Sequence, residues 1–310
     1  MKLLIIIPGI LLTIALAGLG FTPLLQFNKN TITSPLSAVH FGQLTFAIPT
    51  PHPTPNPAIL FKKGPTSTPP PTPTPTPRPP TFAEMNAQWG PCANVPTLFW
   101  HHVQDLGIAK QLGHAQLTVD VNIFRTQMQY VKDQGYTAIR PDQLTAFFDA
   151  GTPLPPKPIL LTFDDGYDDF GSDAAPILHE LGLQATAFIP TGLLNNPGYM
   201  SWDTLGNIAG WGIIYFANHT WSHHSMSAAS AVDDQEITTA DTQLSQHNLN
   251  PAKIFAYPYG TANNNAIAIL AKLGYKLAFT TNPGSIQCKV HRFILPRIRI
   301  GNANLSRYGL

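Results

Sequence analysis

The sequence predicts an α/β domain with a parallel sheet, and three observations support this. Short apolar runs alternate with amphipathic helical segments over residues 95–300. Glycines stand directly after several helical segments, where they commonly end helices. The three most polar clusters each follow directly after an apolar run, as expected where parallel strands present their carboxyl ends at one edge. This order favours parallel strands with helices outside them.

The first half of the domain contains one clear helix between short strands. The apolar run at 95–100 predicts a strand. Asp120 can cap a helix whose apolar stripe includes Phe124 and Met128, and Gly135 ends that helix. The next expected elements are a strand at 136–139, a short helix beginning at Pro141, and a buried strand at 158–163 that runs into acidic residues.

The second half repeats the same unit. Gly182 and Gly274 each end an expected helix, and Ser201 can cap another. The expected elements are, in order, helix 172–181, strand 184–189, helix 202–209, strand 213–216, helix 233–247, strand 253–257, helix 263–273, strand 276–280 and a closing segment at 294–300.

The first ninety residues have a different composition. An uncharged apolar run at 3–19 follows Met1-Lys2, which is typical of a secretory signal peptide or a retained membrane anchor. Fourteen of the 31 prolines lie between Pro49 and Pro80, and alternating Pro-Thr favours an extended polyproline II spacer. We expect a signal or anchor at 1–20, a disordered Pro/Thr-rich linker at 21–90 and a folded domain at 91–310. The protein would be exported, to an extracellular, cell-wall or membrane-anchored location.

Charge and cysteine content narrow the classes of partner and compartment. The net charge of +1 and pI near 7.9 give no basic surface for nucleic acid. The two cysteines, Cys92 and Cys288, lie near the two ends of the domain, and a disulfide between them would persist after export. Spacing alone does not establish that bond.

Two clusters indicate metal chemistry. Asp164 and Asp165 follow an apolar strand, and two adjacent buried carboxylates repel each other unless a cation lies between them. His219 and His223 are four residues apart, which on a helical turn lets both reach one metal, whereas His224 would project about 100° away. The alternatives are an acidic cap or turn and exposed histidines. Together the clusters indicate metal-assisted hydrolysis, with one aspartate as ligand and the other as base.

Three ordered motifs resemble those of polysaccharide deacetylases, carbohydrate esterase family four. They are Leu161-Thr162-Phe163-Asp164-Asp165-Gly166-Tyr167, His219-Thr220-x-x-His223 and Tyr257-Pro258-Tyr259-Gly260. The resemblance covers about 95–300 and implies a distorted (β/α) barrel of about seven parallel strands. The opening run 95–103 and Leu295-Pro296-Arg297-Ile298 are similar to the exported branch that acts on poly-N-acetylglucosamine-like polymers.

The resemblance implies a role for each matching position. Asp164 would be the general base, His101 would protonate the leaving amine, and the backbone N–H of Tyr259 would stabilise the oxyanion. Thr220 would orient the histidine turn. The implied metal ligands are Asp165, His219 and His223, and the implied substrate contacts are Tyr257, Pro258 and Trp221.

Three positions depart from the family pattern. Ala256 stands where the third motif usually begins with Arg, the usual Asp-Trp pair is not evident near 280–282, and Trp100 replaces a preferred Tyr. Arg297 or Arg299 could supply the missing cation beside Asp164. These changes leave the metal site intact and affect only the positioning of the base.

The expected protein is therefore an exported, monomeric, metal-dependent enzyme that removes N-acetyl groups from an N-acetylglucosamine-containing polysaccharide. Its metal would be Zn²⁺, with Co²⁺ or Ni²⁺ as alternatives. The N-terminal segment could attach it to a membrane or cell wall. The rival interpretations are an O-acetyl esterase acting on xylan-type polymers through the same site, and a catalytically silent carbohydrate-binding protein.

Overall fold

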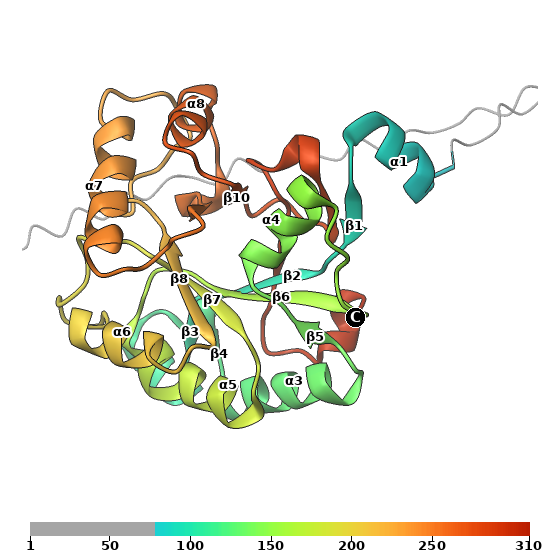
Figure 1. The fold of residues 1–310 in the computed structure, drawn as a ribbon. Coiled ribbons are helices and arrows are strands. Elements are labelled where there is room, and N and C mark those ends of the chain that lie inside the picture. The colour runs from blue at the N-terminus through green and yellow to red at the C-terminus, as the bar shows by residue number, and fades with distance from the viewer. Residues whose placement is uncertain (1–77) are drawn as a thin grey trace, which may run out of the picture. The chain divides into compact units, whose positions relative to one another are not determined.

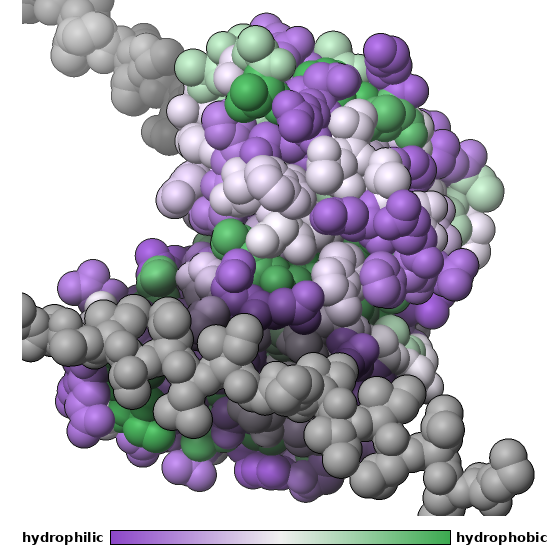
Figure 2. All heavy atoms as spheres, turned by 90° about the vertical axis from the view of Figure 1, so that its left-hand side faces the viewer, coloured by the Kyte–Doolittle hydropathy of each residue, from purple (hydrophilic) through white to green (hydrophobic). Residues whose placement is uncertain are grey.

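A computed structural model describes residues 78–310 of the chain. The signal or anchor expected at 1–20, and the linker as far as residue 77, lie outside the described residues. Within 78–310, none of the helices combines the length and the apolar character needed to cross a bilayer. On the side of α6 and α7, the surface is mainly hydrophilic or neutral, with small hydrophobic areas between (Figure 2).

The centre of the domain is an eight-stranded parallel sheet, close to the number expected (Figure 1). Its order is β10-β9-β8-β7-β6-β2-β12, and β5 pairs with the start of β6. The strands are β2 (Thr97–Trp100), β5 (Thr137–Ala138), β6 (Pro158–Phe163), β7 (Ala185–Ile189), β8 (Ile214–Asn218), β9 (Ile254–Ala256), β10 (Leu277–Phe279) and β12 (Ile298–Arg299). The predicted α/β architecture is confirmed.

The segment that contains β12 closes this sheet toward a barrel. Ile298 pairs with Leu98 on β2, and Leu295 forms a parallel bridge with Phe279 on β10. Because β12 and β10 are the two ends of the strand order, the same short segment touches both edges of the sheet. The result is the expected distorted barrel, and Arg297 is carried fully buried into its interior.

Apart from α2, which the sequence analysis did not predict, the helices of this region lie where helices were expected. Asp120 caps α3 by accepting from the Asn122 N–H, and Gly182 ends α5 with a left-handed φ. Figure 1 shows α3, α5 and α6 along one side, and α7 and α8 together at the opposite end. The helices are α2 (Leu106–Leu112), α3 (Val121–Asp133), α4 (Pro141–Ala150), α5 (Ala175–Leu181), α6 (Trp202–Ala209), α7 (Asp233–Gln246) and α8 (Asn264–Lys272).

The folded domain begins earlier than the predicted boundary at residue 91. Residues Phe82–Trp89 form helix α1, inside the segment assigned to the linker, because Thr81 and Glu84 make a reciprocal capping box. Met85 then packs against the disulfide between Cys92 and Cys288. This bond joins β1 (Cys92–Asn94) to β11 (Ile286–Cys288), an antiparallel pair that the sequence did not predict. In the chain-entropy model, so long a closed loop contributes about 5 kcal/mol.

A two-stranded parallel pair, also unpredicted, lies beside the sheet. It consists of β3 (His102–Val103) and β4 (Thr118–Val119). Both strands are buried, although each has only two residues. Because β3 follows β2 almost at once, the chain beyond the carboxyl end of β2 is held in a fixed path.

Candidate active site

The polar clusters meet at the carboxyl edge of the sheet. Asp164 and Asp165 follow β6, and His219 follows β8, with β7 between the two strands. One ligand atom from each of Asp165, His219 and His223 lies within 4.8 Å of the others. The Nε2 atoms of His219 and His223 are 3.3 and 3.1 Å from Asp165 Oδ1. We call these three residues the ligand trio.

The hydrogen bonding of the ligand trio fits a bound cation. His219 Nδ1 lies 2.8 Å from the carbonyl oxygen of Ala256, so Nδ1 carries the proton and Nε2 of the neutral ring is left as an acceptor. That Nε2 faces Asp165 Oδ1, which is buried and has no hydrogen-bond donor among the described residues. Two facing acceptors in a buried site are compensated when a metal ion lies between them. The tautomer is the one that metal-binding histidines adopt.

The segment that carries the two histidines is not the predicted helical turn. Thr220 and His223 have left-handed φ angles of 68° and 62°, which a right-handed helix excludes. The turn is shaped by side chains instead: Asn218 Oδ1 accepts from the Thr220 N–H at 2.7 Å, and Thr220 Oγ1 accepts from the His224 N–H at 3.0 Å. Thr220 therefore orients the turn, as expected.

His224 does not compete for the site. Its Nε2 lies 3.4 Å from Oδ1 of the fully buried Asp233. The backbone turn thus directs His223 and His224 to different partners. Only His223 belongs to the ligand trio.

Glu236, near the start of α7, fixes the backbone of the histidine turn. The sequence did not indicate this residue. Its Oε2 accepts from the backbone N–H groups of Trp221 and Ser222 at 3.1 and 2.8 Å, and its Oε1 accepts from Ser222 Oγ at 2.7 Å. The side chain is almost fully buried. Its place, thirteen residues after His223 in an acidic first helical turn, gives no sign of this contact.

Asp164 forms a bidentate ion pair with Arg297, which lies on the segment that closes the barrel. The guanidinium donates from Nη1 and Nη2 to the two carboxylate oxygens at 2.8 and 2.7 Å, and from Nε to the carbonyl oxygen of Thr280 at 2.8 Å. Burial raises the pKa of Asp164, but the Arg297 charge and its hydrogen bonds outweigh burial and hold this pKa below its ordinary value. Of the two candidate arginines it is Arg297 that lies beside Asp164, because Arg299 donates to the Gln116 carbonyl at the surface.

Comparison with known proteins identifies the family. Residues 151–278 match the family described as polysaccharide deacetylase. The chain contains a polysaccharide deacetylase domain. The match includes Asp164, both histidines of the ligand trio and Asp165 itself, whereas Arg297 lies outside it. The position of Arg297 beside Asp164 is therefore known from the structure and not from the family match.

Relatives of this deacetylase domain agree in fold and in name. Streptococcus pyogenes deacetylase PplD, solved in complex with acetate, has 29% identity and a TM-score of 0.64, over 70% of this chain and 98% of that chain. The Escherichia coli (strain K12) poly-beta-1,6-N-acetyl-D-glucosamine N-deacetylase is 26% identical over 247 residues, covering 66% of this chain but only 36% of the relative. IcaB from Ammonifex degensii, 19% identical with a TM-score of 0.60 over 70% of this chain and 94% of that chain, shares the fold. The chain is thus a hydrolase of this family.

Three other predicted residues lie around the deacetylase site. His101 is half-buried, with its ring 5.7 Å from that of Phe99. Burial lowers the pKa of His101, and the charges of Asp164 and Asp165 act in the opposite direction. Tyr259 is 67% exposed with its ring 4.7 Å from that of His223, and Trp221 is 41% exposed.

Two predicted substrate contacts are wrong. Tyr257 is fully buried in an apolar cluster with Phe255 and Tyr275, and Pro258 is buried beside it. Neither side chain can meet a polymer at the surface. In this motif only Tyr259 is exposed. Gly260 comes next at φ 77°, where a Cβ would lie 1.9 Å from Thr281 Oγ1, so a glycine is needed there.

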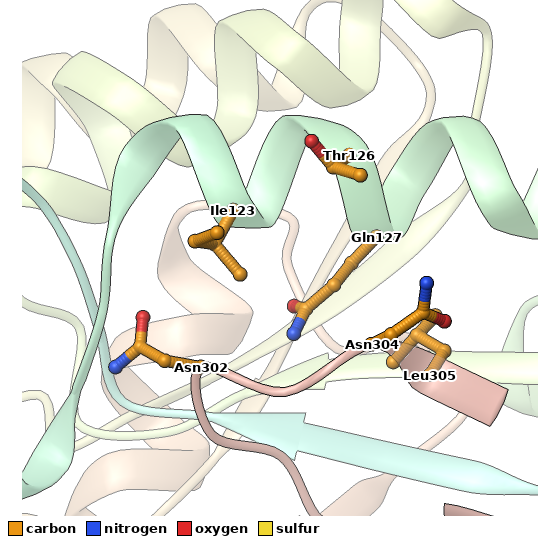
Figure 3. A pocket seen from close by; sticks show the side chains of 6 residues that line it. All are labelled: Ile123, Thr126, Gln127, Asn302, Asn304 and Leu305. Carbon is orange, nitrogen blue, oxygen red and sulfur yellow. The ribbon is translucent and has the colours of Figure 1, made fainter. Parts of the chain in front are cut away.

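A small pocket between α3 and the C-terminal segment belongs to the scaffold of the deacetylase domain (Figure 3). Its volume is about 180 Å³, and none of the predicted site residues lines it. Gln127 spans it: the side-chain amide donates to the carbonyls of Gly301 and Ala303, and Oε1 accepts from Trp100 Nε1. The indole of Trp100, at the position where the exported branch prefers tyrosine, is thus anchored to α3 through Gln127.

Replacing Glu236 should weaken metal binding without abolishing folding. In Glu236→Ala, the Trp221 and Ser222 N–H groups lose their acceptor, so the histidine turn is no longer fixed. Competition with a chromophoric chelator should show Zn²⁺ affinity about 10- to 100-fold below wild type, as for other groups that orient metal ligands. Glu180→Ala, which removes an exposed acid on α5, is the matched control and should bind as wild type does. Equal affinity for both variants would contradict the assigned role.

Replacing Arg297 should destabilise the folded domain, and this loss of folding stability should be larger at pH 7 than at pH 5. Arg297→Met leaves a buried carboxylate without its partner, which costs about 3–5 kcal/mol at pH 7. In wild type the depressed pKa of Asp164 adds stability that is lost as pH falls through the acidic range. In the variant burial raises that pKa, so the folded state binds the extra proton and the deficit shrinks between pH 7 and pH 5.

Urea unfolding of the chelator-treated protein at both pH values measures this deficit. Arg299→Met is the control, because Arg299 is a surface residue that bonds one carbonyl, and its deficit should be small at both pH values. A deficit for Arg297→Met that stays constant with pH would show that Asp164 is not the group being compensated.

Proposed function

We propose that this chain is a metal-dependent N-deacetylase of an N-acetylglucosamine-containing polysaccharide outside the cell. One observation carries the proposal. Two carboxylates adjacent in sequence are buried at one strand end, and each faces a different partner: Asp164 faces a guanidinium, and Asp165 faces two imidazole nitrogens. A base beside a metal site is an arrangement that metal-assisted amide hydrolysis uses.

The ligand trio suits a divalent ion with open coordination positions. Two imidazoles and one carboxylate are a common set for catalytic zinc, and Co²⁺ or Ni²⁺ could occupy the same ligands. When bound, such an ion supplies a Lewis acid for the acetyl carbonyl oxygen and makes a nearby water more acidic.

Different residues of this chain would then carry out the separate steps of proton transfer. Asp164, kept ionised by Arg297, takes the proton from the water that attacks the acetyl carbon. The Tyr259 N–H donates to the oxygen on which negative charge develops. His101 gives a proton to the amine nitrogen as the C–N bond breaks. One C–O bond forms and one C–N bond is lost, so the products are acetate and a free amine on the sugar.

Three features support a polysaccharide substrate and an exported protein. Trp221 and Tyr259 expose aromatic rings next to the ligand trio, where sugar rings could pack. The relative from Escherichia coli is named for a β-1,6-linked N-acetylglucosamine polymer, and PplD was solved with acetate, the product expected here. The disulfide and the apolar run at 3–19 fit an oxidising compartment. The protein would act as a monomer, with its N-terminal segment as the attachment to membrane or cell wall.

Acetate release from a panel of polymers tests the proposal. The full chain should release acetate from at least one of chitin oligomers, β-1,6-linked N-acetylglucosamine polymer and peptidoglycan, and a chelator should stop release until Zn²⁺ is restored. Asp164→Asn should lower the rate about 10²- to 10⁴-fold, the usual contribution of a general base. Asp173→Asn, at a half-buried acid in the π-helical segment before α5, should not.

Two results would reject the proposal. The first is no acetate from any N-acetylated polymer, together with release from O-acetylated xylan, which would make the protein an O-acetyl esterase. The second is unchanged activity in Asp164→Asn, which would remove Asp164 from the mechanism.

A further inference from the structure

Asn218, the last residue of β8, shapes the start of the histidine turn and is itself held by buried polar groups. Its Oδ1 accepts from the Thr220 N–H at 2.7 Å. Its Nδ2 donates to the Ile237 carbonyl at 3.1 Å and to the Tyr275 hydroxyl oxygen at 2.6 Å. The side chain is fully buried. Because an amide accepts at one end and donates at the other, the groups around Nδ2 decide which way its oxygen points.

The Tyr275 hydroxyl can accept from Asn218 because another group takes its proton. Tyr275 lies between α8 and β10, and its hydroxyl donates to Asp241 Oδ1 on α7 at 3.0 Å. A carboxylate only accepts, so the single hydroxyl proton is directed at Asp241 and the oxygen lone pairs are left for Asn218. Burial raises the pKa of Tyr275 well above its ordinary value, so the hydroxyl keeps this proton.

Lys253, just before β9, completes the set near the surface. Its ammonium lies 2.5 Å from Asp241 Oδ2 and 5.7 Å from the centre of the Tyr275 ring. The Asp241 side chain is 16% exposed and that of Lys253 is 36% exposed, whereas Tyr275 is almost fully buried. From the Thr220 N–H to Asp241, every donor points toward the carboxylate. We call Asn218, Tyr275, Asp241 and Lys253 the hydrogen-bond relay.

We propose that Tyr275, Asp241 and Lys253 are positioning residues for the ligand trio. They hold the Asn218 amide with its oxygen toward the histidine turn, and this contact sets the left-handed backbone that brings both histidine ligands to one ion. The inference rests on the proposed function, because it takes the ligand trio to bind a metal. It goes further by assigning part of the metal affinity to a half-exposed ion pair between α7 and the chain before β9.

Zinc affinity of the full-length variants, measured by competition with a chromophoric chelator, tests the relay. Tyr275→Phe removes one of the two acceptors that Asn218 Nδ2 uses. The amide is then held less firmly, and Zn²⁺ binding should weaken about 3- to 10-fold, the effect of one buried hydrogen bond.

Asp241→Asn is the sharper variant, because it reverses the relay while keeping its shape. Lys253 offers only donors, so the new amide turns its oxygen toward the ammonium and its NH₂ group toward Tyr275. The Tyr275 hydroxyl then directs its proton at Asn218, whose Nδ2 also donates. The Asn218 amide is driven to flip, and the Thr220 N–H loses its acceptor. Zn²⁺ affinity should fall about 10- to 100-fold, as when other groups that orient metal ligands are removed.

Tyr215→Phe is the matched control. Tyr215 is a buried tyrosine near the other end of β8, and its hydroxyl accepts from the Ala252 N–H and donates to Asn250 Oδ1. This variant should lose stability in urea as Tyr275→Phe does, yet bind Zn²⁺ as wild type does. Co²⁺ gives a second readout, because its visible absorption depends on coordination geometry. The Co²⁺ spectrum should change in Asp241→Asn and stay as in wild type in the control.

The outcomes separate this inference from the proposed function. If wild type binds neither Zn²⁺ nor Co²⁺, the proposed function fails at its metal site. If wild type binds zinc and either relay variant keeps wild-type affinity, the Ile237 carbonyl alone fixes Asn218 and the inference is wrong. It is also wrong if Tyr215→Phe weakens binding as much as Asp241→Asn does, since the cause is then a general loss of stability. Should Tyr275→Phe not fold, Asp241→Asn decides alone.

Discussion

The site depends on one constraint: two neighbouring carboxylates are buried at the end of β6, and each needs positive charge. Asp164 receives it from Arg297 through two hydrogen bonds. Asp165 Oδ1 faces the two Nε2 atoms of His219 and His223, and the Nε2 of His219 is an acceptor. The first carboxylate is therefore satisfied by the protein, whereas the second would be completed by the proposed cation. This difference supports Asp164 as the base and Asp165 as the ligand, a choice that chain spacing alone left open.

Closure of the barrel supplies the positive charge that Asp164 needs. Arg297 enters the barrel on the segment that joins the two edges of the sheet, and its guanidinium packs 4.4 Å from the Phe99 ring. Polysaccharide deacetylases usually carry an arginine where this chain has Ala256. Here the guanidinium beside Asp164 comes from the closing segment instead.

Local sequence pattern predicted the main elements, whereas contacts that depend on closure of the barrel were not predictable from it. Apolar runs and glycine-ended segments located the main strands and helices, and the carboxyl-end rule placed the ligand trio together. The four-residue spacing of the histidines fits a helix and a left-handed turn equally well, so the turn was predicted wrongly. Motif similarity carries no information on exposure, which is why Tyr257 was misassigned. Glu236 bonds to a loop outside its own helix, so no local pattern marks it. The α1 helix does carry a local signal, the capping box of Thr81 and Glu84, but the segment was assigned to the linker by its composition.

The central claim is that a single cation is held by Asp165, His219 and His223. Crystals of the full chain soaked in Zn²⁺, with anomalous diffraction collected on both sides of the zinc edge, test it directly. The account predicts one anomalous peak about 2.0–2.2 Å from an oxygen of Asp165 and from both Nε2 atoms. A peak that touches Asp164 in place of Asp165, or zinc bound only elsewhere, would contradict it.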